Sequence, residues 1–371
     1  MKVVIVIPTY NEADNVERLI PVLSQEFKKI PGNDFYVLFV DGNSPDGTAD
    51  VVKKLSKKYP FARLLLEKRK AGLGAAYMYG FKHAMKTFKP DVIVEMDADF
   101  QHDPKDIHRL IEKIEEGYDC VIGSRYVKGG GIPKKWALYR KFWSIGGNIF
   151  TRIALGMFEV NDFTTGFRAT RVKGFLDKID LDSVLSKGYS YKFDTLYRLH
   201  KLGAKIVEVP ILFGIRDRGI SKMEGNNPID SLRVVLALRI SDNKSFFRFV
   251  IVGFIGLFVD TGLFNLFRIF IFSAYAALLS GLFGMITTFS LNNYWSFKER
   301  KLEGIGKKVA SFIFYIVSST FPIFVRSVLV RYFVLWFGDT FIVSNTAFFI
   351  GIAFGLVWNF AVYSKIIWRK K

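Results

Sequence analysis

The stretch VIVEMDADFQHDP at residues 92–104 decides the fold of the first part of the chain. Its apolar run, Val92 to Met96, is typical of a buried strand, and carboxylates follow it at once. Asp103 and Pro104 then begin a helix, because aspartate caps a helix N-terminus and proline suits the first helical position. A strand, a polar loop and a helix in succession make one unit of an α/β fold.

The same alternation continues on both sides of this unit. It predicts helices at 13–27, 48–58, 74–87 and 104–116, and further strands at 3–7, 36–40, 64–66, 120–122 and 206–209. We therefore expect residues 1–227 to form a Rossmann-like α/β domain with a mostly parallel sheet. Ligands of such sheets bind beyond the carboxyl ends of the strands, so the polar residues at these ends are the first candidates for chemistry.

Composition excludes several classes of protein. The 371 residues include 53 Lys and Arg against 34 Asp and Glu, a net charge of +19, and half of the chain is hydrophobic. The single cysteine, Cys120, excludes a disulfide framework and a cysteine-based zinc site, so any metal would sit mainly on oxygen ligands. A P-loop motif is absent, and Tyr77 occupies the third glycine position of the nearest dinucleotide fingerprint, which disfavours both nucleotide-binding classes.

The second part of the chain is dominated by long apolar stretches. After an interfacial linker helix at 228–243, residues 244–371 contain four of them, at about 246–272, 274–297, 309–337 and 341–368. Each is long enough to span a bilayer, for which ~20 residues suffice. A buried soluble bundle is the alternative, but it would show charged helix faces. We expect an all-α four-helix transmembrane domain.

Lys and Arg gather before the first apolar stretch, between the second and third, and at the end of the chain. By the positive-inside rule, both termini and the whole first part face the cytoplasm. In a prokaryote, the membrane would be the plasma membrane.

Asp97, Asp99 and Gln101 follow the strand at a spacing of two, which places their side chains on one face where the backbone stays extended. Two carboxylates and an amide suit Mg²⁺ or Mn²⁺, which takes its other ligands from substrate phosphates. A solvated strand end is the simpler interpretation of such a short motif. Its place beside other polar strand ends favours a metal site and a diphosphate-linked substrate.

Residues 120–158 contain seven basic and no acidic residues, interleaved with Trp and Phe. This mixture predicts an amphipathic helix near 134–156 that lies on the membrane surface. A nucleic-acid surface is the alternative, which the apolar stretches elsewhere in the chain disfavour. Arg125 and Arg140 would then be placed to receive an anionic group that arrives from the bilayer.

A glycine-containing loop, FGIRDRGISKMEGNN at residues 213–227, carries three cationic donors, Arg216, Arg218 and Lys222. It could close over a diphosphate and offset the charge of a departing nucleotide. An ordinary solvated loop is the equally simple interpretation.

With these residues in view, residues 1 to about 240 resemble the inverting family-two glycosyltransferases with the GT-A fold, and among them the dolichyl-phosphate mannose synthases. The motifs that carry the resemblance are VIPTYNE (6–12), VDGNS (40–44), DADFQHDP (97–104), GSRY (123–126), DFTTGFR (162–168) and RDRGISKM (216–223). The remainder resembles a GtrA-like membrane domain, chiefly through FRFVIVGFIG at 247–256.

The resemblance implies a role for each matching residue. The metal and diphosphate would be held by Asp97, Asp99 and Gln101, and the acceptor's phosphate by Arg125 and Arg140. Asp162 and Thr165 would shape the sugar and acceptor pocket. The donor's base and ribose would be bound by Pro8, Tyr10, Glu12 and Asp41, and the segment that closes over the donor would contribute Arg216, Ser221 and Lys222.

The activity implied is transfer of mannose from GDP-mannose to a polyprenyl (dolichyl) phosphate in the bilayer, with inversion, helped by Mg²⁺ or Mn²⁺. The processive-synthase signature QxxRW is absent, which disfavours a polymerase. Two alternatives stay open: a UDP-glucose-dependent polyprenyl-phosphate glucosyltransferase and a translocator of lipid-linked sugars. No nucleic-acid partner is expected.

Overall fold

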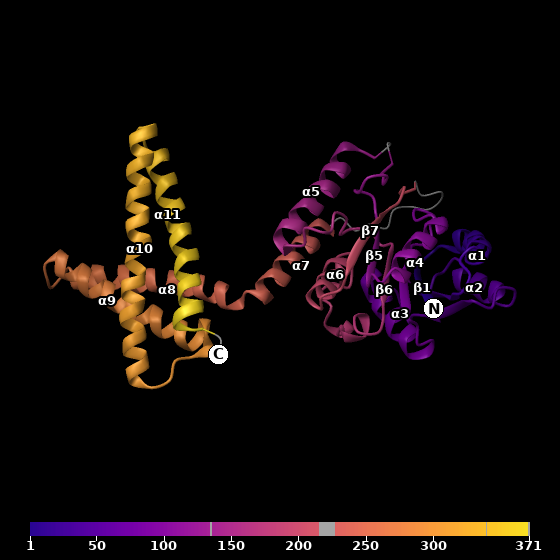
Figure 1. The fold of residues 1–371 in the computed structure, drawn as a ribbon, viewed down its shortest axis with the longest axis horizontal. Coiled ribbons are helices and arrows are strands. Elements are labelled where there is room, and N and C mark those ends of the chain that lie inside the picture. Colours follow the sequence, from indigo (N-terminus) through magenta and orange to yellow (C-terminus); the bar gives the residue numbers. More distant parts are fainter. Residues whose placement is uncertain (134–135, 215–226, 339, 370–371) are drawn as a thin grey trace. The chain divides into compact units, whose positions relative to one another are not determined.

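The computed structural model of the protein describes residues 1–133, 136–214, 227–338 and 340–369. The chain forms two compact units, Met1–Arg239 and Ile240–Lys371, whose helices and strands are labelled in Figure 1.

The first unit is built on a seven-stranded sheet. In chain order its strands are β1 (Lys2–Thr9), β2 (Asp34–Asp41), β3 (Ala62–Leu66), β4 (Val92–Glu95), β5 (Cys120–Ser124), β6 (Arg168–Arg171) and β7 (Ile206–Pro210). Their order across the sheet is β3-β2-β1-β4-β6-β5-β7, and only β6 runs antiparallel to its neighbours. The sequence patterns miss β6, because RATR has two charges in four residues and no apolar run.

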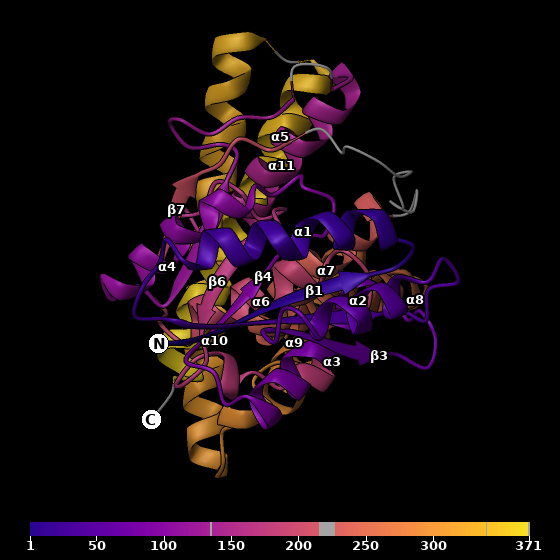
Figure 2. The same ribbon diagram turned by 90° about the vertical axis from the view of Figure 1, so that its right-hand side faces the viewer.

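Helices cover both faces of this sheet. They are α1 (Ala13–Phe27), α2 (Thr48–Ser56), α3 (Leu73–Thr87), α4 (Ile107–Glu115), α5 (Leu138–Leu155), α6 (Tyr191–Lys201) and α7 (Asn227–Asp242), with short 3-10 turns η1 (Pro104–Asp106), η2 (Leu176–Lys178) and η3 (Leu181–Ser183). Apolar residues of α1, α2 and α4 pack on one face, and those of α3, α6 and α7 on the other. Figure 2 shows β1 between α1 and α3.

Two apolar layers hold the sheet, because successive side chains of a strand point to opposite faces. In β1, Val3, Ile5 and Ile7 enter one layer, whereas Val4 and Val6 enter the other. A strand buried on both sides reads as the continuous apolar run seen in the sequence. The α/β class expected for this part of the chain is confirmed.

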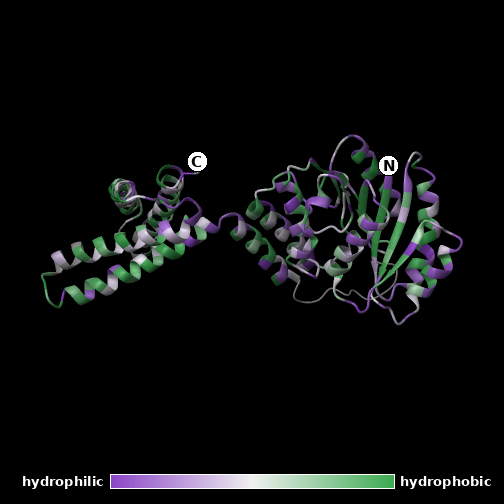
Figure 3. Ribbon diagram, turned by 90° about the horizontal axis from the view of Figure 1, so that it is seen from below, coloured by the Kyte–Doolittle hydropathy of each residue, from purple (hydrophilic) through white to green (hydrophobic). Residues whose placement is uncertain are grey.

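The second unit is helical. Its long helices are α8 (Lys244–Phe267), α9 (Ser273–Leu291), α10 (Ile305–Phe337) and α11 (Phe341–Val362), with π-helical turns η4 (Asn292–Ser296) and η6 (Tyr363–Ile367) and a 3-10 turn η5 (Lys298–Arg300). Helix α8 packs along α9, and α10 along α11. In Figure 3, where the ribbon is coloured by residue hydropathy, long stretches of these helices are green, the colour of hydrophobic residues.

Among the described residues, two helical segments, Lys244–Phe267 and Phe349–Ile367, are long and apolar enough to cross a bilayer. The structure therefore has a helix in each of the four apolar stretches, and the crossing of the bilayer by all four stays a prediction. At one end of this unit the two π-helical turns pack together: Asn293 accepts a hydrogen bond from the Trp368 indole at 2.9 Å, and Trp368 stacks on Phe297.

Candidate active site

Three polar loops meet at the carboxyl edge of the sheet, after β1, β2 and β4. They are adjacent because β1 lies between β2 and β4. Each loop holds one residue that is not glycine in the left-handed region: Asn11 (φ 54°), Asn43 (φ 59°) and Phe100 (φ 60°). Such conformations cost free energy and often gather at functional sites. The backbone itself thus marks this edge.

Asp41 ties the first two loops together. It is fully buried, and its carboxylate accepts hydrogen bonds from the Thr9 hydroxyl at 2.9 Å and from the Ser44 hydroxyl at 2.6 Å. The Ser44 hydroxyl in turn accepts the amide of Asn11 at 3.0 Å. Asp41 therefore supports the shape of the expected nucleotide pocket, and direct contact between it and a ribose stays a prediction.

The other expected nucleotide residues lie on the same edge. Pro8 pairs with Val40 in the sheet. The Lys70 ammonium lies over the ring of Tyr10, 4.6 Å from its centre. The Glu12 carboxylate accepts a hydrogen bond from the Asn15 side chain at 2.6 Å, at the start of α1. The structure brings Pro8, Tyr10, Glu12 and Asp41 to one pair of loops.

The carboxylates that follow β4 have different surroundings. Asp99 is buried, and its Oδ1 accepts the Gln101 amide at 3.1 Å, whereas the Asp97 side chain is one-third exposed. The amide of Asp97 donates to His102 Nδ1 at 3.2 Å. Burial lowers the pKa of His102 to about 3, so its ring is neutral and fixes the loop as a hydrogen-bond acceptor.

Gln101 joins this loop to the start of the segment at 213–227. The Gly214 amide donates to the Gln101 carbonyl at 2.9 Å, and the Gln101 side-chain amide donates to the Gly214 carbonyl at 3.4 Å. The segment expected to close over the donor therefore leaves the sheet beside the carboxylates. Arg216, Ser221 and Lys222 lie outside the described residues.

The oxygen ligands of this loop fit a divalent cation whose remaining coordination positions are filled by the substrate. Among the described residues, no group of three or more His, Cys, Asp or Glu side chains comes together, so a cage made of protein ligands alone is not seen there. Asp97, Asp99 and Gln101 offer two carboxylates and an amide. Mg²⁺ and Mn²⁺ typically take one or two carboxylates together with phosphate oxygens and water, so the residues fit such an ion.

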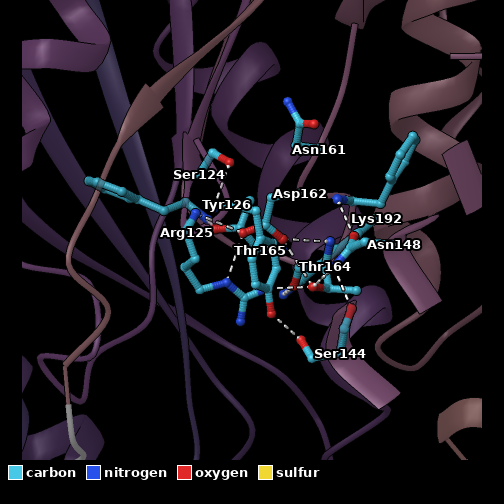
Figure 4. Close-up of polar contacts among 12 residues, drawn as sticks. Ser124, Arg125, Tyr126, Ser144, Asn148, Asn161, Asp162, Thr164, Thr165 and Lys192 are labelled. Atoms are coloured by element: carbon cyan, nitrogen blue, oxygen red, sulfur yellow. Dashed lines mark hydrogen bonds and ion pairs between the residues drawn. The ribbon is translucent and has the colours of Figure 1, made fainter. Parts of the chain in front are cut away.

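Arg125 forms a buried ion pair with Asp162. Its Nε and Nη2 each donate to the carboxylate at 2.7 Å, and its backbone amide donates to the same group at 3.0 Å (Figure 4). Although burial alone would raise it, the pKa of Asp162 lies below its usual value because of the Arg125 guanidinium. Asp162 thus neutralises the positive charge of Arg125, which the sequence predicted would bind an acceptor phosphate. Phosphate binding by Arg125 stays a prediction.

Aromatic rings lie around Arg125 and Arg140. Phe213 lies 5.4 Å from the His102 ring, 5.9 Å from the Trp136 ring and 5.2 Å from the Arg125 guanidinium. The Arg140 guanidinium stacks over Trp136 at 3.9 Å. Phe213 therefore contacts the loop that carries Asp97 and Asp99 as well as Arg125, and it reaches Arg140 through Trp136. Thr165 is buried beside Asp162, and its amide donates to that carboxylate at 3.2 Å.

Lys192, which lies outside the sequence motifs, is buried in the same region. Its Nζ donates to the Thr164 carbonyl at 3.3 Å. Beneath the site, Arg168 donates to both oxygens of Glu95 at 3.0 Å, and the Tyr191 hydroxyl donates to Glu95 at 2.5 Å. No local pattern marks Lys192, because a lone lysine in a polar stretch resembles a surface residue. Arg168 belongs to the motif DFTTGFR, but the motif alone does not show that it is paired with Glu95.

Comparison with known proteins agrees with this geometry. Residues 4–177 match the glycosyl transferase family 2, and residues 248–368 match the GtrA/DPMS transmembrane domain. A dolichol-phosphate mannosyltransferase from Pyrococcus furiosus is 32% identical over 372 aligned positions, which cover 99% of both chains. The chain belongs to the dolichol-phosphate mannosyltransferase family. It is a glycosyltransferase with a membrane domain, which confirms the resemblance seen in the motifs.

Two other proteins are similar over different parts of the chain. An undecaprenyl-phosphate mannosyltransferase from Micrococcus luteus is 43% identical over 61% of this chain and 88% of its own. A solved structure of a mannosyltransferase from Pyrobaculum calidifontis, in complex with GDP-mannose and Mn²⁺, has a TM-score of 0.38 at 12% identity, covering 97% of this chain and 86% of its own.

Proposed function

We propose that this protein transfers mannose from GDP-mannose to a polyprenyl (dolichyl) phosphate in the membrane, with inversion at the anomeric carbon and release of GDP. Membership of the family supports the transfer of mannose to a lipid phosphate. The structural observation that best supports the proposal is Phe213, which lies against His102 of the loop bearing Asp97 and Asp99 and against Arg125. A nucleotide sugar and an anionic acceptor would therefore meet around one ring.

The chemistry needs little proton transfer. A phosphate monoester has its second pKa near ~6, so at neutral pH the acceptor is mostly a dianion and needs no general base. The protein must instead hold two anions close together. Asp97, Asp99 and Gln101 would hold Mg²⁺ or Mn²⁺, which would reduce the negative charge of the leaving diphosphate.

The remaining residues would bind and orient the substrates. Tyr10, Glu12 and Asp41, with Pro8, would hold the nucleoside, and the segment with Arg216, Ser221 and Lys222 would close over the donor. Arg140 would receive the lipid phosphate beside Trp136. Attack from the face opposite the nucleotide inverts the anomeric carbon and gives a β-linked product.

The acceptor would reach this site along the membrane surface. Helix α5 exposes a row of large apolar side chains, including Leu138 (82% exposed), Phe142 (71%) and Trp143 (63%). An amphipathic helix of this kind binds in the plane of the interface. The positive-inside rule places the basic connections of the second unit on the cytoplasmic side of the membrane. The first unit and both termini would then lie in the cytoplasm.

The test uses the full-length protein in nanodiscs that contain polyprenyl phosphate. Supplied separately with GDP-mannose and UDP-glucose, the protein should label the lipid only from GDP-mannose, and NMR of the product should show the β anomer. Chelation of divalent cations or Asp99→Asn should lower kcat/KM by at least about 100-fold, because charge stabilisation at the leaving group is lost.

Asp50→Asn, on the surface of α2, is the matched control and should leave the rate unchanged. Label entering from UDP-glucose, or a product with the α configuration, would contradict the proposal.

A further inference from the structure

Lys192 is a buried cation that lacks a carboxylate partner among the described residues. It lies in the first turn of α6 and is 2% exposed. Its Nζ donates to the Thr164 carbonyl at 3.3 Å (Figure 4). It also lies 4.2 Å from the centre of the Tyr189 ring. Within the described parts of the chain, no carboxylate oxygen comes within 4.0 Å of Nζ.

The other buried cations of this region are fully paired. Arg125 makes two bonds to Asp162, and Arg168 makes two bonds to Glu95. Burial of a charge without a partner costs several kcal/mol, so such a group is expected where a ligand supplies the partner. Burial lowers the pKa of Lys192 to about 8 against the opposing effect of Asp97, so the amine still carries its proton at neutral pH.

Gly166 provides the space that the ammonium occupies. A Cβ atom built at residue 166 would lie 2.7 Å from Lys192 Nζ and 3.6 Å from His102 Cε1. The ring of His102 is buried, and its Nε2 has no hydrogen-bond partner among the described residues. The His102 ring and the Lys192 ammonium therefore both lie close to the same glycine, next to the loop of Asp97 and Asp99.

We propose that the Lys192 ammonium, which lies in the space left by the missing side chain of Gly166, is a phosphate-binding group of the active site and donates to an anionic oxygen of a substrate. This inference rests on the proposed function and names a residue of that site. Arg125 and Asp162 form a neutral pair, whereas the Lys192 ammonium has no carboxylate oxygen within 4.0 Å among the described residues and can pair with a substrate phosphate. The phosphate comes either from the nucleotide sugar or from the lipid, and the experiment distinguishes them.

The decisive variants are Lys192→Met, which keeps the length of the side chain and removes its charge, Lys192→Arg, which keeps the charge, and Gly166→Ala, which displaces Nζ. Lys201→Met, on an exposed position of the same helix, is the control. Each full-length protein is assayed in nanodiscs for KM of GDP-mannose, KM of polyprenyl phosphate, and Kd of GDP and of guanosine.

We expect Lys192→Met to raise one of the two KM values about 10- to 100-fold, as expected for the loss of one charge-assisted hydrogen bond. Its melting temperature should stay the same or rise, because an unpaired buried charge has been removed. Lys192→Arg should recover part of the loss, and Gly166→Ala should raise the same KM. Lys201→Met should change neither KM.

A higher KM for GDP-mannose, with weaker GDP binding and unchanged guanosine binding, shows that Lys192 binds the diphosphate of the donor. A higher KM for polyprenyl phosphate alone assigns the lipid phosphate. Unchanged KM values with a lower kcat or a lower melting temperature overturn the inference, while the proposed function stands if wild type transfers mannose.

Absence of transfer by wild type, with GDP binding still dependent on Lys192, overturns the proposed function and not the inference. If Lys192→Met does not fold, Gly166→Ala decides between the outcomes.

Discussion

At the residue scale, the charges of Arg125 and Asp162 have to be considered together, because the two side chains form a buried ion pair. The sequence presents Arg125 as a cation and Asp162 as a pocket residue, and the structure pairs them so that the guanidinium is held rigidly beside Phe213. A bidentate pair of this kind fixes orientation as well as charge. Asp162 also accepts the amides of Thr164 and Thr165, so one carboxylate organises the whole DFTTG loop.

We therefore expect Asp162→Asn to destabilise the protein by about 3–5 kcal/mol near neutral pH, because it leaves Arg125 buried without a counter-charge. The folded pKa of Asp162 is depressed, so its contribution is fully present above the unfolded value of about 3.9 and is lost as the pH falls through the folded value. Thermal melts from pH 7 to pH 3 should show the gap between wild type and variant narrowing below about pH 4. A gap independent of pH would contradict this account.

At the scale of elements, helices α8 and α9 approach closely at Gly256, which faces Thr288 and Gly284 of α9. A Cβ atom at Gly256 would lie 2.2 Å from the Thr288 methyl group, whereas one at Gly253 on the same helix would meet no atom within 4 Å. Small residues allow membrane helices to pack closely where the hydrophobic effect gives no drive. The contact explains why glycine is needed at one position and tolerated at the other.

Gly256→Ala should consequently destabilise the protein by about 1–3 kcal/mol, the usual cost of overpacking. Gly253→Ala should be neutral or slightly stabilising, because alanine favours a helix by about 1 kcal/mol over glycine. Unfolding of both variants in detergent, followed by tryptophan fluorescence, checks the difference. Equal midpoints for the two variants would show that the α8–α9 contact does not limit stability.

At the scale of the whole molecule, a water-soluble donor and a membrane-bound acceptor must reach one site. The catalytic chemistry lies in the first unit, and the transmembrane domain matched at 248–368 lies in the second. The exposed apolar row on α5 belongs to the first unit, so we expect the first unit to have a membrane-binding surface of its own.

The double variant Phe142→Asp with Trp143→Asp should lower transfer to long-chain polyprenyl phosphate about tenfold or more, because charges cannot enter the apolar interface. Transfer to a short, water-soluble prenyl phosphate should change little, since the chemistry is untouched. Leu185→Asp, an exposed apolar residue outside α5, serves as the control. Equal losses on both acceptors would place the effect in the catalytic site and refute the membrane role of α5.

Features that depend on neighbouring residues could be predicted from the amino-acid sequence alone. Apolar runs of strand length, the Asp103–Pro104 helix start and the long apolar stretches each place an element, because local backbone preference and burial act over a few residues. The motif residues after β1, β2 and β4 could be predicted for the same reason: parallel strands bring their carboxyl ends to one edge.

The folded structure was needed to show which charged side chains in the site are paired with an opposite charge and which are not. Asp162 cancels Arg125 from 37 positions away, β6 enters the sheet antiparallel between β4 and β5, and Lys192 is buried by loops that no local pattern connects to it. A charge is defined by its solvent exposure and its partners, and both depend on contacts between distant segments that form only when the chain folds.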